Sequence, residues 1–480
     1  MFKKATIVLL VVLALTISAV LVAAQNQLPG SGWLSGQQIQ NVGTGPATIV
    51  FTAYDTAGNP SPCGSKPAAA GAGVNFSTNE CQVGPGFVGS AVVSAEQPIA
   101  AVVNVANNPT GPAGGMYRGT DGSQVNKVIA FPLVKANFNN RTTTLYLQNA
   151  STGPTTIDVQ FKMRNGQTYN KQYPNVPVNA MVVVSPADAN IPAQQFGGAT
   201  ATASGSGVLA GTALEHQTTA QVAENLAAYT GFTEANYDST AYCPLVRNGH
   251  SGALQTTGID VQNVSAAAQK IKVTYTYRIG NGPTQTKVVE SADAVAPGVS
   301  FNFYAQNGTY GMPVGALGAA KVEGSGGGDV AAIVTDTGLG RTPRRITAYA
   351  CFPASVASAK VAMPQYKEFF NGNTSGINVQ NVGNADATIT IVYTATNNGG
   401  ATATFRNTVP LAPGALFPFY GVSGSPASVT VVSGNAAALN GSFGSAIITS
   451  TQPIVATQNE SPDGSRPLQQ DAKMYEGFNQ

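Results

Sequence analysis

The sequence has few charged residues. Lys, Arg, Asp and Glu together make up 10% of its 480 residues, against about 25% in an average soluble protein. The formal net charge is +2 and falls to zero without Lys3 and Lys4. Because nucleic acids and acidic lipid surfaces attract basic proteins electrostatically, this charge balance does not predict nucleic acid as a partner.

Residues that commonly carry catalysis or bind metals are also scarce. The chain has two histidines, His216 and His250, without metal-ligand spacing, and it has no Cys-x-x-Cys motif. The acidic residues are scattered, and no carboxylate pair stands out as glycosidases require. We therefore expect no enzyme activity, no catalytic residue, no cofactor and no dedicated metal site. Calcium held by loops between domains stays open as an alternative, since Asp side chains and carbonyls suffice for it.

The first residues are typical of an export signal. Lys3 and Lys4 precede an apolar stretch from Ile7 to Val22, and small residues follow at Ala23 and Ala24. This order predicts a signal peptide over residues 1–24 and a secreted protein at the extracellular cell surface. Without cleavage the stretch is long enough to span a bilayer. After cleavage we expect no membrane span.

The four cysteines of an exported chain predict two disulfides. Cys63 and Cys81 lie close together in one loop-rich stretch. Cys243 and Cys351 stand near the two ends of the third domain, where the first and last strands of many sandwiches lie side by side. Position along the chain therefore favours pairing Cys63 with Cys81 and Cys243 with Cys351.

A Gln-Asn pair at the predicted end of a strand, followed by a turn and a second strand, recurs four times in the sequence. It is found at Gln40-Asn41, Gln148-Asn149, Gln262-Asn263 and Gln380-Asn381. The spacings are 108, 114 and 118 residues, the size of one β-sandwich domain. The repeat predicts four domains over residues 25–126, 127–240, 241–360 and 361–480.

Each Gln-Asn pair is followed by a turn and an alternating strand. Eight residues after each Asn stands an isoleucine, at Ile49, Ile157, Ile271 and Ile389. From that isoleucine apolar and polar residues alternate, which is the pattern of an antiparallel strand with one buried face. The fold class is therefore all-β, with four tandem immunoglobulin-like antiparallel β-sandwiches after the signal peptide. About seven short strands are expected in each domain, and in the fourth copy residues 444–448 and then 452–456 form the element that closes the repeat.

The Asn-Val-Gly sequence that ends two of these strands carries a family resemblance. Asn41-Val42-Gly43 and Asn381-Val382-Gly383 precede strands rich in Thr, Ile and Val. The chain thus resembles the tandem immunoglobulin-like modules of prokaryotic cell-surface and adhesion-related proteins. Asn149-Ala150-Ser151 and Asn263-Val264-Ser265 depart from the pattern. The resemblance covers nearly all of the mature chain and implies a surface-exposed stalk, adhesive or assembly role, with no catalytic residues.

The first copy is shorter than the others before its Gln-Asn pair. Only 11 residues separate Pro29 from Gln40, whereas 16 or 18 separate the corresponding Pro and Gln elsewhere. This difference suggests that the first domain lacks a full opening strand, and an open sheet edge is a pairing site for another chain. The alternative is that residues 25–36 form a short strand or a flexible terminus.

These observations favour a non-catalytic extracellular structural protein, either fibre-forming or adhesive. The expected partners are other copies of the chain through the first-domain edge strand, a surface glycan, or another envelope protein. The alternative is a secreted carbohydrate- or matrix-binding protein. Trp33 is the only tryptophan, which weakens that alternative. Closing tyrosines near the domain ends, Tyr117, Tyr229, Tyr349 and Tyr475, are interpreted as packed junction residues rather than a ligand platform.

Overall fold

The computed structural model describes residues 28–107, 111–218, 223–340, 344–462 and 472–480. The predicted signal peptide lies outside these residues. Every helix in the described segments is a short 3-10 turn, and none is long and apolar enough to cross a bilayer. The all-β prediction is confirmed, because antiparallel strands form the rest of the regular structure.

Strand pairing divides the described chain into four units, since no ladder between named strands crosses from one unit to another. Unit 1 contains β1 (Leu34–Asn41), β2 (Ala47–Asp55), β3 (Pro60–Ala68), β4 (Gly73–Ser77), η1 (Thr78–Glu80), β5 (Gly89–Ser94), β6 (Ile99–Ala106) and β7 (Gly114–Arg118). Unit 2 contains β8 (Val128–Ala136), β9 (Arg141–Asn149), β10 (Thr155–Met163), β11 (Thr168–Val176), β12 (Met181–Val184), η2 (Pro186–Ala189), β13 (Gln195–Ala203), β14 (Leu209–Gln217), β15 (Leu226–Thr230), β16 (Phe232–Thr233) and η3 (Glu234–Asn236).

Units 3 and 4 make up the rest of the described chain. Unit 3 contains β17 (Thr240–Asn248), β18 (Gln255–Asn263), β19 (Ile271–Ile279), β20 (Gln285–Glu290), β21 (Ser300–Tyr304), β22 (Ala316–Gly324), β23 (Val330–Gly338), β24 (Arg345–Ala350), β25 (Phe352–Pro353) and η4 (Ala354–Val356). Unit 4 contains β26 (Ser358–Glu368), β27 (Asn373–Asn381), β28 (Ile389–Ala395), η5 (Asn398–Gly400), β29 (Thr402–Asn407), β30 (Leu416–Tyr420), η6 (Val422–Gly424), β31 (Val429–Gly434), η7 (Ala436–Leu439), β32 (Ser442–Pro462), β33 (Lys473–Glu476) and β34 (Phe478–Asn479). The predicted starts at residues 241 and 361 fall inside β17 and β26.

Each unit packs a peripheral sheet on an inner sheet. In unit 2 the peripheral order is β11-β10-β13-β8-β16 and the inner order is β12-β9-β14-β15, and unit 3 repeats both orders. Unit 4 departs from the short strands that were expected, because β32 runs without interruption over 21 residues. The first half of β32 pairs with β26 and β28 and its second half pairs with β27. A single strand can therefore serve both sheets without a break at Pro453.

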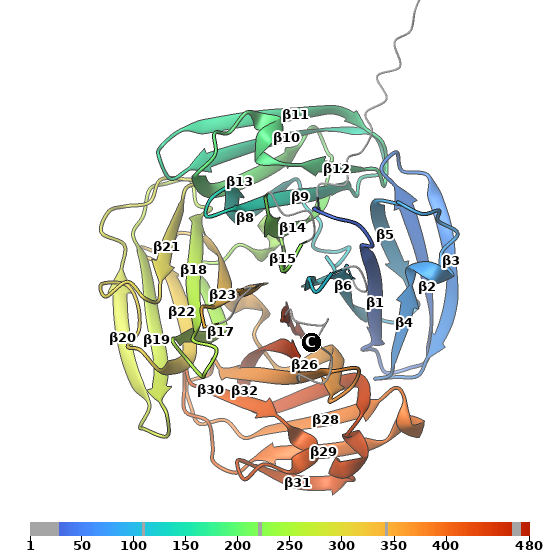
Figure 1. Ribbon diagram of the computed structural model, residues 1–480, viewed down its shortest axis with the longest axis vertical. Coiled ribbons are helices and arrows are strands. Elements are labelled where there is room, and N and C mark those ends of the chain that lie inside the picture. The colour runs from blue at the N-terminus through green and yellow to red at the C-terminus, as the bar shows by residue number, and fades with distance from the viewer. Residues whose placement is uncertain (1–27, 108–110, 219–222, 341–343, 463–471) are drawn as a thin grey trace, which may run out of the picture.

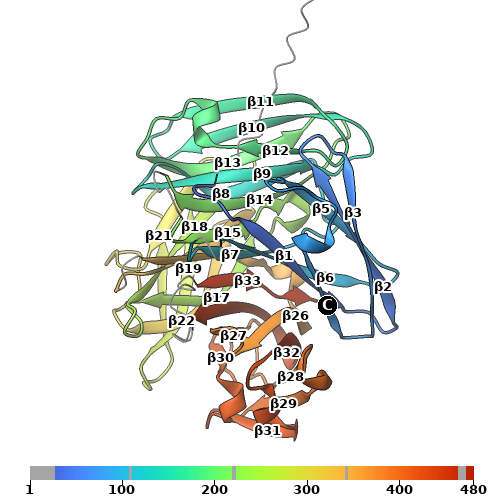
Figure 2. The same cartoon turned by 45° about the vertical axis from the view of Figure 1, so that its right-hand side comes forward.

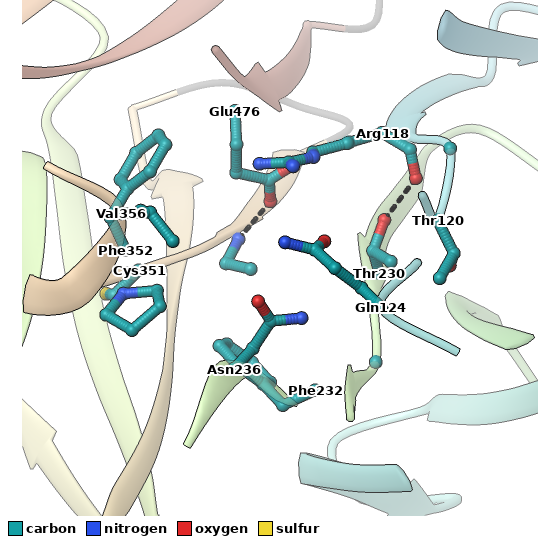
Figure 3. Close-up of a pocket in the computed structure, with 14 residues that line it drawn as sticks. Arg118, Thr120, Gln124, Thr230, Phe232, Asn236, Cys351, Phe352, Val356 and Glu476 are labelled. Carbon is teal, nitrogen blue, oxygen red and sulfur yellow. Dashed lines mark hydrogen bonds between the residues drawn. The ribbon is translucent and has the colours of Figure 1, made fainter. Parts of the chain in front are cut away.

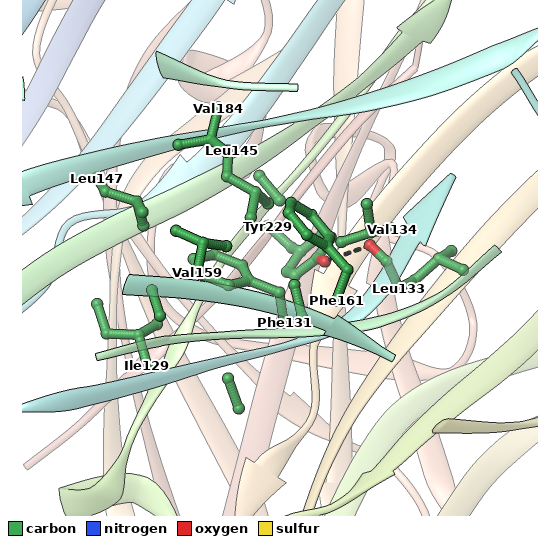
Figure 4. Close-up of a cluster of buried hydrophobic side chains, with 14 of the residues drawn as sticks. Ile129, Phe131, Leu133, Val134, Leu145, Leu147, Val159, Phe161, Val184 and Tyr229 are labelled. Carbon is green, nitrogen blue, oxygen red and sulfur yellow. Dashed lines mark hydrogen bonds between the residues drawn. The ribbon is translucent and has the colours of Figure 1, made fainter. Parts of the chain in front are cut away.

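The alternating pattern of the sequence places the core as predicted. Ile49, Ile157, Ile271 and Ile389 are each 0% exposed and occupy the same position in β2, β10, β19 and β28. In unit 2, Val159 and Phe161 continue the buried face and pack with Phe131 and Leu145 from neighbouring strands (Figure 4). Burial of these apolar faces between two sheets is the main force that holds each unit together.

The four units close into a ring around a common axis (Figure 1). The last inner strand of every unit lies at the centre, where β7 contacts β15 and β33, and β24 contacts the same two strands (Figure 2). The first and last units therefore touch, and Asn104 Nδ2 donates to Gln365 Oε1 at 2.5 Å across this closure. A closed ring is not a stalk, which was one of the three roles that the family resemblance implied, beside an adhesive and an assembly role.

Candidate functional site

The repeated asparagine clamps a loop in all four units. The side-chain amide of Asn381 donates to the carbonyls of Ala385 at 2.8 Å and Leu411 at 2.7 Å, while its oxygen accepts the Gly383 N–H. Asn41, Asn149 and Asn263 make the same three kinds of contact in their own units. The asparagines are fully buried, and in each unit one of the three contacts, such as that with the Leu411 carbonyl, is buried while the other two are partly buried. Each side chain therefore satisfies a backbone carbonyl that has little access to water.

The repeated glutamine serves the junctions between units. Gln262 Nε2 donates to the Gly298 carbonyl in its own unit and to the Ala199 carbonyl of unit 2. Gln380 makes the corresponding bonds to Gly414 and to Ala320 of unit 3. The Gln-Asn repeat therefore marks one structural position, in which Asn fixes a loop and Gln faces the preceding unit.

At the two junctions of unit 1 a serine takes part in this contact. Gln148 Nε2 donates to the Asn179 carbonyl, which also accepts from Ser90 Oγ of unit 1. Gln40 Nε2 donates to the Gly71 carbonyl, which also accepts from Ser445 Oγ of unit 4. The four junctions are thus variants of one contact, and the fourth of them closes the ring.

Both predicted disulfides are present. Cys63 is bonded to Cys81 and Cys243 to Cys351. The second bond joins β17, the opening strand of unit 3, to the residue after β24, its central strand. The bond therefore ties the peripheral sheet of unit 3 to the axis of the ring.

Each closing tyrosine outside unit 1 bonds to an opening strand. The hydroxyls of Tyr229, Tyr349 and Tyr475 donate to the carbonyls of Leu133, Leu245 and Gln365, each one residue beyond a proline. In units 3 and 4 the same hydroxyl also accepts an N–H from the opening strand. Burial raises the pKa of each of these tyrosines well above its ordinary value. The interpretation of these three as packed junction residues agrees with this geometry.

The substitution Tyr349→Phe is expected to lower the free energy of unfolding by about 2 to 3 kcal/mol, because it leaves the Leu245 N–H and carbonyl buried without a partner. Tyr117→Phe is the matched control, since the Tyr117 hydroxyl has no hydrogen-bond partner among the described residues, and we expect a change below about 0.5 kcal/mol. Denaturant titration of both variants measures the difference, and equal losses would contradict the proposed role of the hydroxyl.

Among the residues that the structure describes, unit 1 has no counterpart of the opening strand that the other units possess. Its peripheral sheet has the order β3-β2-β5, and no described strand pairs with the second edge of β5. In unit 2 that position is taken by β8, which pairs with β13. The sequence-based expectation of a missing opening strand is therefore confirmed for the described residues.

The missing strand leaves the sandwich of unit 1 open. Ala91 of β5 occupies the place of Ala199 in β13, as its pairing with Ala53 shows, yet Ala91 is exposed while Ala199 is 1% exposed. Val93, the counterpart of the fully buried Ala201, is only partly buried. We call this exposed inner face and free edge of β5 the open edge of unit 1.

An ion pair between the opening strand and the inner sheet is present in units 2, 3 and 4 but has no counterpart among the described residues of unit 1. In units 2, 3 and 4 a cation of the opening strand pairs with an acid of the inner sheet, as Lys135 does with Glu215 at 2.9 Å. Arg247 pairs with Asp336, and Lys367 with Glu460. In unit 1 the position of Glu215 is taken by Val105 of β6. Unit 1 therefore lacks the acid as well as the cation, and no carboxylate is left unpaired at this position.

A cavity of about 50 Å³ lies at one end of the ring axis, where the central strands terminate (Figure 3). The residue after each closing tyrosine reaches this cavity, so Arg118, Thr230, Ala350 and Glu476 line it from four units. We call it the axial cavity. The sequence pattern did not predict this cavity. The available signal was that the four residues stand at the same position of the repeat and yet include a cation, an acid, a hydroxyl and a methyl group.

The two histidines lie in different units and do not meet. His216 is buried in β14, where its ring contacts Thr144 Oγ1 and the Gln217 carbonyl, and burial lowers its pKa. His250 lies in the turn before β18, and partial burial lowers its pKa as well. The described parts of the chain hold no group of three or more His, Cys, Asp or Glu side chains placed to bind a metal ion.

Comparison with known proteins identifies no family for this chain. No protein-family model matches it, and no curated protein matches it. A solved Thermotoga maritima protein designated 1070 is 15% identical, with a TM-score of 0.19, over 25% of this chain and 96% of its own. A tetra-tandem repeat from the extending region of a large adhesion protein is 11% identical, with a TM-score of 0.11, over 94% of this chain and 95% of its own. At these TM-scores neither likeness establishes the fold or the function.

Proposed function

We propose that this protein is a non-catalytic extracellular structural subunit, a fibre-forming or adhesive component of the cell surface, that assembles through the open edge of unit 1. The observation that carries the proposal is the exposure of Ala91, whose counterpart in a complete unit is buried. Two disulfides and the predicted signal peptide support an oxidising extracellular location.

The open edge has the properties of a surface that pairs with another strand. β5 contains no charged residue and no proline, and Val92 is 41% exposed. Natural proteins usually protect a free edge with charges or proline, because its unpaired N–H and carbonyl groups otherwise recruit a further strand. An occupant of this edge would also cover the partly buried apolar side chains beneath it.

A second copy of the chain offers a suitable strand. Unit 4 carries β31 beyond β29, a strand that units 2 and 3 do not have in their described sheets. β31 lies at a free edge, has no charge or proline, and exposes Val431 at 37% and Val432 at 46%. One copy therefore lacks a peripheral strand at one place and has an additional one at another.

Pairing of β31 with β5 of the next copy would be a heterologous contact. Such a contact does not use the same surface on both partners, so repetition produces an open filament unless the rotation closes a ring. This geometry supports a fibre-forming role. An isologous pairing of two β5 edges would instead stop at the dimer.

Mixing two edge variants tests the proposed function. Val92→Lys places a charge on β5 and Val431→Lys places one on β31, so each variant alone is expected to lose assembly at least tenfold in sedimentation velocity and electron microscopy. An equimolar mixture is expected to form dimers but no longer species, because one good β5 and one good β31 remain. Val288→Lys, on the exposed edge strand β20, is the matched control and should assemble normally.

Three results would overturn this assignment. Wild-type mature protein that stays monodisperse as single particles at high concentration excludes self-assembly. Assembly that survives both substitutions excludes these two edges. Assembly that Val92→Lys abolishes but Val431→Lys leaves at the dimer indicates isologous pairing of two β5 edges and excludes the filament.

A further inference from the structure

The axial cavity contains a buried carboxylate with a free oxygen. Glu476 is 3% exposed, and its Oε1 accepts the Ala350 N–H. Its Oε2 is buried and has no hydrogen-bond partner among the described residues. A buried carboxylate oxygen is normally hydrogen-bonded, so this atom is an unsatisfied acceptor on a residue that lines the cavity.

Glu476 shares the cavity with a partly buried cation. Arg118 donates to the Gly477 carbonyl at 3.4 Å, and its guanidinium lies 4.4 Å above the Phe478 ring. Burial raises the pKa of Glu476 to about 6, while the Arg118 charge opposes the rise. Burial likewise lowers the pKa of Arg118, while the negative charges of Glu476 and of the exposed Asp121 raise it. The charges on the lining therefore balance, which disfavours a charged ligand of either sign.

The rest of the lining combines amides with apolar surface. The side chains of Gln124 and Asn236 enter from different sides, and their amide ends point towards the space below Glu476 (Figure 3). Phe232, Phe352 and Val356 supply apolar wall. The amide groups and the carboxylate–guanidinium pair offer both hydrogen-bond donors and acceptors. A ligand hydroxyl matches such a lining, because it can donate one hydrogen bond and accept others.

From this lining we propose that the axial cavity binds the hydroxyl-bearing end of a neutral polyol or sugar. One hydroxyl donates to Glu476 Oε2, and the carbon-bound hydrogens of the ligand rest on the apolar wall. The cavity of about 50 Å³ limits the enclosed part to a few heavy atoms. This inference does not depend on assembly through the open edge, because the cavity is built within a single ring.

Saturation-transfer NMR with glycerol and erythritol tests the inference, with propan-1-ol as the probe that lacks neighbouring hydroxyls. Wild-type mature protein is expected to bind both polyols more tightly than propan-1-ol. Glu476→Gln should weaken polyol binding about tenfold or more, because a hydrogen bond to a charged acceptor is lost. Glu290→Gln, an exposed glutamate at the end of β20, is the matched control and should bind as wild type does.

Val356→Trp provides a second route, since a larger side chain in the lining should block the cavity without removing a charge. Thermal unfolding of every variant checks that the ring remains folded, and if Glu476→Gln unfolds, Val356→Trp and Asn236→Ala decide the question. Failure of wild-type protein to bind either polyol, or equal binding by wild type and by the folded cavity variants, would overturn the inference. Sedimentation of the same samples shows whether assembly is retained, so the two proposals fail separately.

Discussion

Removal of the Cys243–Cys351 disulfide is expected to lower the free energy of unfolding by about 4 to 5 kcal/mol. The bond closes a loop with a sequence separation of 108 residues, and a crosslink over so long a loop greatly restricts the unfolded chain. Both sulfur atoms also belong to the core of unit 3, so replacement by alanine adds a packing loss. Denaturant titration of the Cys243→Ala/Cys351→Ala variant measures the change.

The second disulfide supplies the comparison. Cys63 and Cys81 are separated by only 18 residues, so the Cys63→Ala/Cys81→Ala variant is expected to lose about 3 kcal/mol. Replacement of Cys351 should also change the lining of the axial cavity, because Cys351 is one of its lining residues. A larger loss from the short loop than from the long one would contradict the argument.

Replacement of Asn381 by alanine is expected to lower the free energy of unfolding by about 3 to 5 kcal/mol. The side chain satisfies the carbonyls of Ala385 and Leu411 and the Gly383 N–H, and Asn381 is fully buried. Leaving the buried Leu411 carbonyl without a partner costs about 1 to 3 kcal/mol, and the loss of the two partly buried hydrogen bonds adds to this. Equilibrium unfolding measures the effect.

A neighbouring asparagine in the same turn is the control for this prediction. Asn384 is exposed, and Asn384→Ala should change the free energy of unfolding by less than about 0.5 kcal/mol. Asn381→Asp is informative too, because it keeps the acceptor for Gly383 but removes the two donated bonds. A stability of Asn381→Ala close to that of Asn384→Ala would show that the repeated asparagine does not act as a clamp.

Local sequence patterns predicted the strands well because strand pairing leaves a direct trace in the sequence. The alternation from Ile157 to Met163 and from Ile271 to Tyr277 reported which side chains face the core, and all of those expected to be inward are buried. The short spacing between Pro29 and Gln40 reported the missing strand of unit 1. The length of β32 was not predicted, because its two halves pair with different strands and local sequence does not show that change of partner.

The amino-acid sequence by itself determined the repeat, the buried face of each strand, the cysteine pairs and the incomplete first unit, since all of these follow from periodicity and spacing along the chain. Only the tertiary structure decided that the units close into a ring and that Arg118 and Glu476 meet at its axis. Closure depends on contacts between residues such as Asn104 and Gln365, which are 261 positions apart. The angle between successive units is set by side-chain packing at their junctions. The ring closes only if the four angles together bring the last unit back to the first, and local sequence patterns do not show this.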